Sequence, residues 1–405
     1  MRVLVADDDR FARVLLGDLL ESWGHEVLMA EDGEEAWQIL ENDSGIAILL
    51  TDWVMPGLDG PSLCRRLRGR ERERYLPIIL VTSQSSQDHL IEGLQAGADC
   101  FVTKPVAEGV LWAQLQTCQR ILALESRLSR KVRALEEASQ RIHRDLEAAA
   151  AIQKSHLPEK HPTHPGVDFA WVYDACETLG GDMFNVFRLD EEHVGVYILD
   201  VSGHGTTAAL LSVALSRVLV PLPQQGGILK GELEEPPFYA LPSPAAVAEE
   251  LNRRFQTSES GLFATFLYGI LNPRSGVFRF VSAGHPGPVH ILAEGEPRDV
   301  GEAAATGPPI GIVQDAEYGE QEILLAPGSR LLLYTDGVDE TQNQAGENFG
   351  RSRIVDLLSA STCEGSTLED SVATLRKSLL DFSAGEPQRD DITIVGLGIT
   401  DEGPQ

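Results

Sequence analysis

Cysteine is scarce in this sequence, and its positions follow no disulfide or metal-binding pattern. The thiols are odd in number and scattered over 405 residues, without any Cys-x-x-Cys pair; they lie at Cys64, Cys100, Cys118, Cys176 and Cys363. A zinc site or a disulfide framework needs regularly spaced cysteines, so we expect neither. This composition is typical of a protein in the reducing cytoplasm.

Long apolar segments and basic residues are also in short supply. The apolar run after Arg2 spans only residues 3–6, too short for a signal peptide, and none reaches the roughly 20 residues that cross a bilayer. Lys and Arg number 33 against 62 Asp and Glu, which gives a formal net charge of −29. Nucleic acids and anionic membranes attract cationic surfaces, so we expect no nucleic-acid or membrane partner and a cytoplasmic location.

Apolar residues make up 42% of the chain, enough for packed cores, and its length predicts two or three domains. The first 118 residues alternate short apolar runs with amphipathic stretches. This pattern predicts a doubly wound sheet of five parallel strands with helices on both faces. The expected strands are 3–6, 25–30, 47–50, 77–81 and 100–102, and the expected helices are 11–23, 34–41, 60–68 and 87–96.

Polar side chains follow the predicted strands where parallel sheets place their ligand sites. They are Asp7, Asp8 and Asp9 after the first strand, Asp52 after the third, Thr82 and Ser83 after the fourth, and Lys104 after the fifth. Converging carboxylates repel one another, and a bound Mg²⁺ together with a lysine would relieve that repulsion. A solvated acidic edge without an ion does not explain the matching polar groups at the other strand ends.

This first part resembles the receiver domain of response regulators. The resemblance implies Asp52 as phosphoacceptor, Asp7, Asp8, Asp52 and the backbone carbonyl of Val54 as Mg²⁺ ligands, and Thr82, Phe101 and Lys104 as the switch residues. It also implies a cognate sensor histidine kinase as partner. Phosphorylation adds charge and acceptor oxygens, so it would rearrange the face formed by the last strand and helix.

Residues 110–153 contain neither Gly nor Pro, and apolar residues recur every seventh position. The repeat consists of Ile121, Leu128, Leu135, Ile142 and Ala149. It predicts a long helix, which we interpret as a parallel coiled coil that makes the chain a homodimer. Lys131 and Asp145 interrupt the second apolar row, so a single amphipathic helix packed on one domain stays open as the alternative. Pro158 and Pro162 are expected to end the helix.

Four short motifs in the second half place an aspartate at a strand end or in a tight turn. They are Asp182 after Gly180-Gly181, Asp200 after the apolar run 194–199, Asp336 before Gly337, and Asp390 followed by Asp391. Any single motif can equally be an ordinary turn, in which the aspartate carboxylate accepts a hydrogen bond from the nearby backbone. Four such acids can hold two hard divalent cations through oxygen atoms alone.

These motifs resemble those of the metal-dependent protein phosphatases, the PPM family, and above all its bacterial sporulation and stress-response branch. The resemblance covers about 168–398 and implies an α/β sandwich of two antiparallel sheets flanked by helices. The strands expected are 168–173, 183–188, 194–199, 265–271, 277–282, 289–292, 330–334 and 392–397, with helices at 207–220, 244–255, 351–359 and 367–382.

The same resemblance implies the chemistry of the site. Asp200 matches the acid that bridges two Mn²⁺ or Mg²⁺ ions. Asp182 and the Val201 backbone carbonyl match ligands of one ion. Asp336 and Asp390 match ligands of the other. The implied reaction is direct attack of an activated water on phosphoserine or phosphothreonine of a protein, and the implied substrate is a small anti-sigma-factor antagonist.

Three features leave roles open. No Arg occurs at 175–179, where eukaryotic members grip the phosphate, so phosphate binding would rest on the metals. His204 is separated from Asp200 by three residues, which puts a general-acid role in doubt. His285 more readily has a structural role than a catalytic one.

Residues 221–243, rich in Pro, Gly and Glu, are expected to form a loop insertion.

The sequence thus predicts a receiver domain at 1–118, a helical coiled-coil linker at 119–157 and a PPM-type phosphatase domain at 158–400. We interpret the chain as a response regulator whose phosphatase output is gated by aspartyl phosphorylation. A phosphorylation-gated adaptor with an inactive phosphatase fold is the alternative. A DNA-binding regulator is disfavoured by the acidity of the chain.

Overall fold

The computed structural model describes residues 1–70, 74–83, 87–158, 166–236, 238–256, 261–293, 297–299, 306–361 and 366–400. The chain forms two compact units, Met1–Arg141 and Ile142–Gln405. Cys363 lies outside the described residues, and the cysteines within them are free thiols. Among the described helices none is long and apolar enough to cross a membrane.

The first unit contains the predicted five-stranded parallel sheet, in the order β2-β1-β3-β4-β5. The strands are β1 (Arg2–Ala6), β2 (Glu26–Ala30), β3 (Ile48–Asp52), β4 (Ile78–Thr82) and β5 (Cys100–Thr103). The helices are α1 (Arg10–Ser22), α2 (Gly33–Asn42), α3 (Gly60–Arg68), α4 (Gln87–Gln95) and the start of α5 (Glu108–Lys154). Each lies within a few residues of its predicted position.

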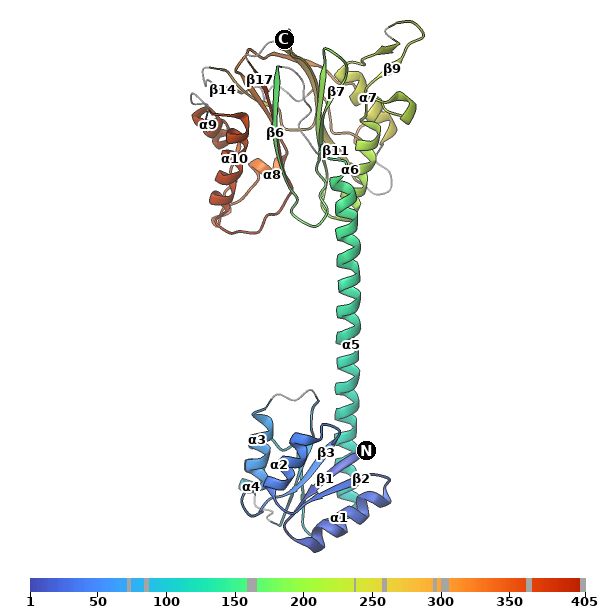
Figure 1. The fold of residues 1–405 in the computed structure, drawn as a ribbon, viewed down its shortest axis with the longest axis vertical. Helices are drawn as coiled ribbons and strands as arrows, with labels where there is room; N and C mark the ends of the chain where they lie inside the picture. Colours follow the sequence, from blue (N-terminus) through green and yellow to red (C-terminus); the bar gives the residue numbers. More distant parts are fainter. Residues whose placement is uncertain are drawn as a thin grey trace. The chain divides into compact units, whose positions relative to one another are not determined.

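Alternation along the buried strands explains why helices cover both faces of this sheet. On β1, Val3 and Val5 pack with α1 and the start of α5 in one core, whereas Leu4 and Ala6 pack with α2 and α3 in another. Side chains on a strand point alternately to the two faces, so an unbroken apolar strand needs cover on each side. The predicted receiver fold is therefore confirmed (Figure 1).

Helix α5 is confirmed as a helix, and its apolar seam is exposed. Leu124, Leu128, Leu135 and Ile142 keep 60–72% of their surface accessible. The coiled-coil dimer and the single packed helix both stay predictions.

The second unit contains two five-stranded sheets, in the orders β15-β12-β11-β8-β7 and β14-β13-β16-β17-β6. All their strand pairs are antiparallel, as predicted. The strands are β6 (Val167–Asp174), β7 (Met183–Arg188), β8 (Val194–Val201), β11 (Ala264–Asn272), β12 (Val277–Ala283), β13 (Val289–Ile291), β14 (Pro297–Asp299), β15 (Gln321–Leu324), β16 (Arg330–Tyr334) and β17 (Ile392–Ile399).

Helices cover the outer faces of this sandwich (Figure 1). They are α6 (Thr206–Val218), α7 (Pro244–Arg254), α8 (Asp336–Asp339), α9 (Arg351–Ser361) and α10 (Leu368–Ser383). One core, which includes Phe184, Ile198 and Val395, lies between the two sheets. A second core packs α6 and α7 on one sheet, and a third packs α9 and α10 on the other. The predicted α/β sandwich is confirmed; β14, β15 and the single-turn α8 were not predicted.

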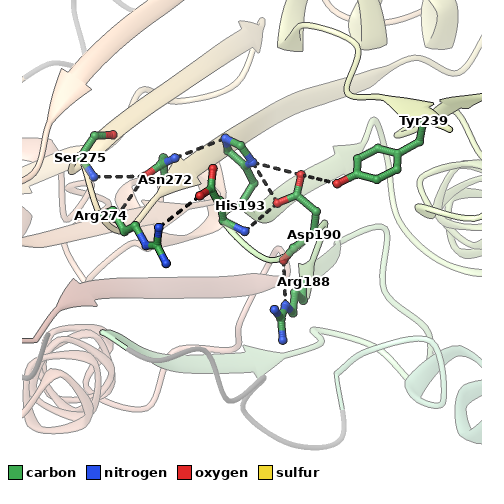
Figure 2. Close-up of polar contacts among 8 residues, drawn as sticks. Arg188, Asp190, His193, Tyr239, Asn272, Arg274 and Ser275 are labelled. Carbon is green, nitrogen blue, oxygen red and sulfur yellow. Dashed lines mark hydrogen bonds and ion pairs between the residues drawn. The ribbon is translucent and has the colours of Figure 1, made fainter. Parts of the chain in front are cut away.

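The segment at 221–243, predicted as a loop insertion, contains short regular elements. The segment contains a short 3-10 helix, η1 (Pro223–Gln225), and a hairpin of β9 (Gly231–Glu232) and β10 (Tyr239–Ala240). Figure 2 shows why the hairpin is held: the Tyr239 hydroxyl donates to Asp190 Oδ2 (3.2 Å), and His193 Nδ1 lies 2.9 Å from Asp190 Oδ1. This anchor joins residues 49 positions apart, which a local composition argument cannot find.

Candidate functional site

The polar residues at the strand ends of the receiver come together as predicted. Asp7 and Asp52 are buried and Asp8 is exposed, and ligand oxygens of all three lie within 4.8 Å of one another. Lys104 Nζ lies 2.8 Å from Asp7 Oδ2 and 2.8 Å from Asp52 Oδ1. Burial raises the pKa of Asp52, and the hydrogen bond from Lys104 offsets part of that rise. The trio has the oxygen chemistry and the spacing that a hard cation requires.

The switch residues lie on the neighbouring strands. Thr82 ends β4 and is buried, while Phe101 lies on β5 and is partly exposed. The Lys104 backbone N–H donates to the Thr82 carbonyl oxygen (2.7 Å), so the ends of β4 and β5 are held side by side. Val54 follows β3 with an exposed side chain, which leaves only its backbone for a role in the site.

In the second unit, four predicted acids come from four separate segments. Asp182 precedes β7, Asp200 lies near the end of β8, Asp336 begins α8, and Asp390 precedes β17. Burial first, and then repulsion from Asp336 and Asp390, raises the pKa of Asp200 to about 8. Burial and Asp390 likewise raise the pKa of Asp336 to about 6. Carboxylates that repel one another this strongly form a cluster suited to divalent cations.

The acids of this cluster are spread more widely than those of the receiver. Across the described residues, the receiver trio alone brings three carboxylate oxygens within 4.8 Å of one another. The phosphatase acids interact pairwise, with Asp200 facing both Asp182 and Asp336. An acid between two others suits a pair of ions that share a ligand.

Two threonines that the sequence reasoning missed hold the first acid. Asp182 Oδ2 accepts hydrogen bonds from Thr335 Oγ1 (2.8 Å) and Thr393 Oγ1 (2.6 Å), and all three side chains are buried. Each threonine belongs to a motif of another acid, Thr335-Asp336 and Asp391-Ile392-Thr393. A threonine close to an acid in each of the two motifs was the available signal.

Asp391 has a different role from its neighbour Asp390. Its Oδ1 accepts from the Cys176 backbone N–H (2.8 Å), and its Oδ2 accepts from the Gly181 N–H (2.6 Å). The Asp391 carboxylate is buried, and both of its oxygens accept hydrogen bonds from the backbone of the segment that leads to Asp182. Asp391 therefore shapes the loop, whereas Asp390 is left to face the other acids.

Glycines let these segments approach closely. A Cβ at Gly181 would lie 2.9 Å from the Val201 carbonyl oxygen, and a Cβ at Gly337 would collide with the backbone carbonyl of Asp391. The backbone of the Asp182 loop thus lies against the end of β8. Only glycine permits that contact without displacing one of the two segments.

The last turn of α5 holds the same loop from the other side, through a residue that the sequence reasoning passed over. Gln153 is 3% exposed, and its Nε2 donates to the Gly180 carbonyl oxygen (2.6 Å) and the Ser212 hydroxyl (3.3 Å). Its Oε1 accepts from the Gly180 N–H (3.3 Å). Leu179 packs beside it on α5 and α6.

The two histidines differ in setting. His285 is buried, Thr265 Oγ1 lies 2.8 Å from its Nδ1, and burial lowers the pKa of its ring to about 3. It therefore stays neutral, which favours the structural interpretation. His204 is exposed and pairs with Glu177 (2.9 Å).

Known proteins resemble both units. Residues 190–400, more than half of the chain, match the family model "Stage II sporulation protein E (SpoIIE)". The chain belongs to the SpoIIE family. Residues 3–116 match the response regulator receiver domain. The predicted combination of a receiver domain with a PPM-type phosphatase domain is thereby confirmed.

Individual relatives of this SpoIIE-family chain match one unit each. Phosphoserine phosphatase RsbP of Bacillus subtilis (strain 168) is 32% identical over 208 residues, which cover 48% of this chain and 45% of RsbP. A CheY homolog of Campylobacter jejuni is 35% identical over 117 residues, 29% of this chain and 90% of that protein. The SiaA-PP2C domain of Pseudomonas aeruginosa covers 65% of this chain and 98% of its own, with a TM-score of 0.52 and 22% identity, and supports the fold alone.

Proposed function

We propose that this chain is a response regulator whose output is metal-dependent hydrolysis of phosphoserine or phosphothreonine on a protein. The cluster of four acids carries the proposal, because four distant segments each contribute one carboxylate, and burial together with repulsion within the cluster raises the pKa of Asp182, Asp200 and Asp336. The printed name of RsbP, a phosphoserine phosphatase, supports the same chemistry.

In this proposal Asp182, Asp200, Asp336, Asp390 and the Val201 carbonyl would hold two Mn²⁺ or Mg²⁺ ions, and Asp200 would be the ligand that both ions share. Ions bound there would supply Lewis acidity and an activated water for attack on phosphorus. The chain itself keeps the ligands in place. Thr335 and Thr393 orient Asp182, and Asp391 holds the loop before it.

The receiver site supports a second part of the proposal. Asp52 accepts a phosphoryl group from a sensor kinase, Asp7, Asp8 and the Val54 carbonyl hold Mg²⁺ beside it, and Lys104 and Thr82 bind the phosphoryl oxygens. Phe101 follows the position of Thr82. The contacts from Lys104 to both buried carboxylates support this assignment.

We further propose domain limits of 1–118, 119–157 and 158–400, a homodimer formed through α5, and an anti-sigma-factor antagonist as the substrate. An inactive adaptor is disfavoured because each predicted acid and its supporting hydrogen bonds are in place. An adaptor would not need Thr335 and Thr393 to hold the carboxylate of Asp182.

The test is Asp200→Ala in the full chain, with an aryl phosphate and Mn²⁺ as the assay. Loss of the shared ligand should lower kcat/KM by roughly a thousandfold or more, because it removes charge stabilisation of the transition state. Asp168→Ala, an exposed aspartate on β6, is the matched control and should keep parental turnover. Near-parental turnover by Asp200→Ala would show that these acids are not the catalyst.

A further inference from the structure

A cavity of about 280 Å³ adjoins the acid cluster of the phosphatase unit. Its walls come from α8 and the turn after it, the second half of α10, and the segment that leads into β17. Asp390 lines the cavity and also belongs to the cluster. Sites for whole small-molecule ligands are usually about 300–1,000 Å³, so this cavity is slightly smaller than such a site and suits side chains of a larger ligand.

Among the described residues that line the cavity, two are cationic, Arg376 and Arg389, and four are acidic, Asp174, Glu340, Glu386 and Asp390. Arg376 is neutralised by Asp174, whose carboxylate oxygens lie 2.6 and 2.9 Å from its guanidinium. Arg389 is exposed, and within the described part of the chain its guanidinium makes no hydrogen bond or ion pair. Guanidinium groups bind phosphoryl oxygens in a bidentate manner, so Arg389 is available for a phosphorylated ligand.

An apolar side chain lies exposed on the opposite wall. Leu380 on α10 keeps 60% of its surface accessible, whereas its neighbours in the cavity, Leu379 and Ile392, are buried. An exposed leucine next to a buried apolar floor provides a contact for an apolar side chain of a partner. The cavity therefore combines a group that can bind an anion, Arg389, with an exposed apolar side chain, Leu380.

The rim of the cavity is already ordered. Gln388 Nε2 donates to the backbone carbonyl oxygens of Asp174 (2.7 Å) and Asp390 (2.8 Å). These two bonds hold the segment that carries Arg389 against the end of β6. A rim that is fixed before binding loses less conformational freedom when a ligand arrives.

We propose that this cavity is the substrate-recognition site: Arg389 binds the phosphoryl group, and Leu380 packs on an apolar side chain near it in the substrate sequence. The inference rests on the proposed phosphatase function, which already takes a phosphorylated protein as substrate, and adds a sequence preference to it. The preferred substrate has an apolar residue close to the phosphoserine.

The experiment compares three substrates of the full chain with Mn²⁺: an aryl phosphate, a phosphoserine peptide with a nearby leucine, and the same peptide with aspartate in place of that leucine. The parent should prefer the leucine peptide. Leu380→Asp should lower the ratio of kcat/KM for the leucine peptide to that for the aryl phosphate by about tenfold, the usual size of an apolar-pocket effect. Leu324→Asp, an equally exposed leucine on β15, should leave that ratio unchanged.

Arg389→Ala should raise KM about tenfold for all three substrates, because they share the phosphoryl group, and Arg389→Lys should restore part of the loss. An unchanged ratio in Leu380→Asp, or equal turnover of the two peptides by the parent, would overturn the inference. Faster turnover of every substrate by Leu380→Asp would overturn it too, since a segment of this chain would then occupy the cavity. Absence of aryl phosphate hydrolysis by the parent would contradict the proposed function itself.

Discussion

At the scale of single residues, two adjacent aspartates perform unlike tasks. Asp390 repels Asp200 and Asp336, and we propose it as a cation ligand. Asp391 also repels Asp182 and Asp200, but its two carboxylate oxygens accept hydrogen bonds from the N–H groups of Cys176 and Gly181. In this proposal Asp391 supports the loop before Asp182, and its hydrogen-bond partners distinguish it from Asp390.

Asp52 is expected to be the phosphoacceptor of the receiver. It lies within reach of Lys104 and of the two acids that we assign to Mg²⁺. Incubation of the full chain with a small phosphodonor and Mg²⁺ should add one acid-stable, base-labile phosphate, and Asp52→Asn should remove it, because an amide cannot act as the nucleophile. Asp99→Asn is unsuitable as a control because Asp99 bonds Arg68, so exposed Asp88→Asn serves instead. Undiminished labelling of Asp52→Asn would contradict the assignment.

At the scale of elements, the end of α5 is expected to tune metal binding. Gln153→Glu replaces the amide donor by an acceptor, so it loses the two bonds that Nε2 donates, to the Gly180 carbonyl oxygen and the Ser212 hydroxyl, with little change in shape. The loop before Asp182 should then be less well ordered, and the Mn²⁺ concentration for half-maximal activity should rise about tenfold, as for other groups that orient metal ligands.

Direct titration of Mn²⁺ binding by calorimetry provides a second measurement for Gln153→Glu, independent of turnover. Lys154→Ala, an exposed neighbour on the same turn, is the control and should bind metal like the parent. Unaltered metal affinity in Gln153→Glu would limit Gln153 to a packing role.

The hairpin of β9 and β10 is expected to loosen in a pH-dependent manner. Burial raises the pKa of Asp190, but hydrogen bonds from the Glu192 N–H and from His193 outweigh it and lower that pKa below its usual value. A lowered pKa means that the anchor is fully present above the ordinary carboxyl pKa and is lost as the pH falls through the folded value.

Tyr239→Phe removes the hydroxyl donor to Asp190 and should speed amide exchange in the hairpin a few-fold at pH 7. The ratio of variant to parent rates should approach one as the pH falls through the lowered pKa of Asp190, where the carboxylate of the parent becomes protonated. A ratio that does not change with pH would show that the bond to the ionised Asp190 is not the anchor (Figure 2).

At the scale of the whole molecule, the receiver and the phosphatase share one helix. The boundary between the two compact units falls within α5, whose last turn contacts the loop of Asp182. A flexible tether would only raise local concentration, whereas a helix can transmit rotation, sliding or a change of dimer contact. We therefore expect phosphorylation of Asp52 to act on the metal site through the seam of α5.

A beryllofluoride mimic of the aspartyl phosphate should raise the phosphatase activity of the full chain. The double variant Leu128→Asp, Leu135→Asp places charges on the exposed seam, so it should abolish both the dimer and this response, as judged by light scattering and turnover. An equal response in both proteins would exclude the seam as transmitter. A response in neither would exclude control by the receiver.

The sequence by itself determined the two domain types and most of their elements. The unbroken apolar runs of β1 and β3, the seven-residue repeat of α5 and the acids at strand ends are local patterns that can be recognised along the sequence. They were sufficient to predict that Asp52 and Asp200 lie at the ends of buried strands.

Only the tertiary structure decided which groups support these acids. Three hydrogen bonds illustrate this. Thr393 and Asp182 are 211 residues apart, Gln153 and Gly180 are 27 apart, and Tyr239 and Asp190 are 49 apart. A hydrogen bond between distant segments leaves no periodic trace in the sequence, because its geometry exists only after the sheets have paired and brought the two backbones together.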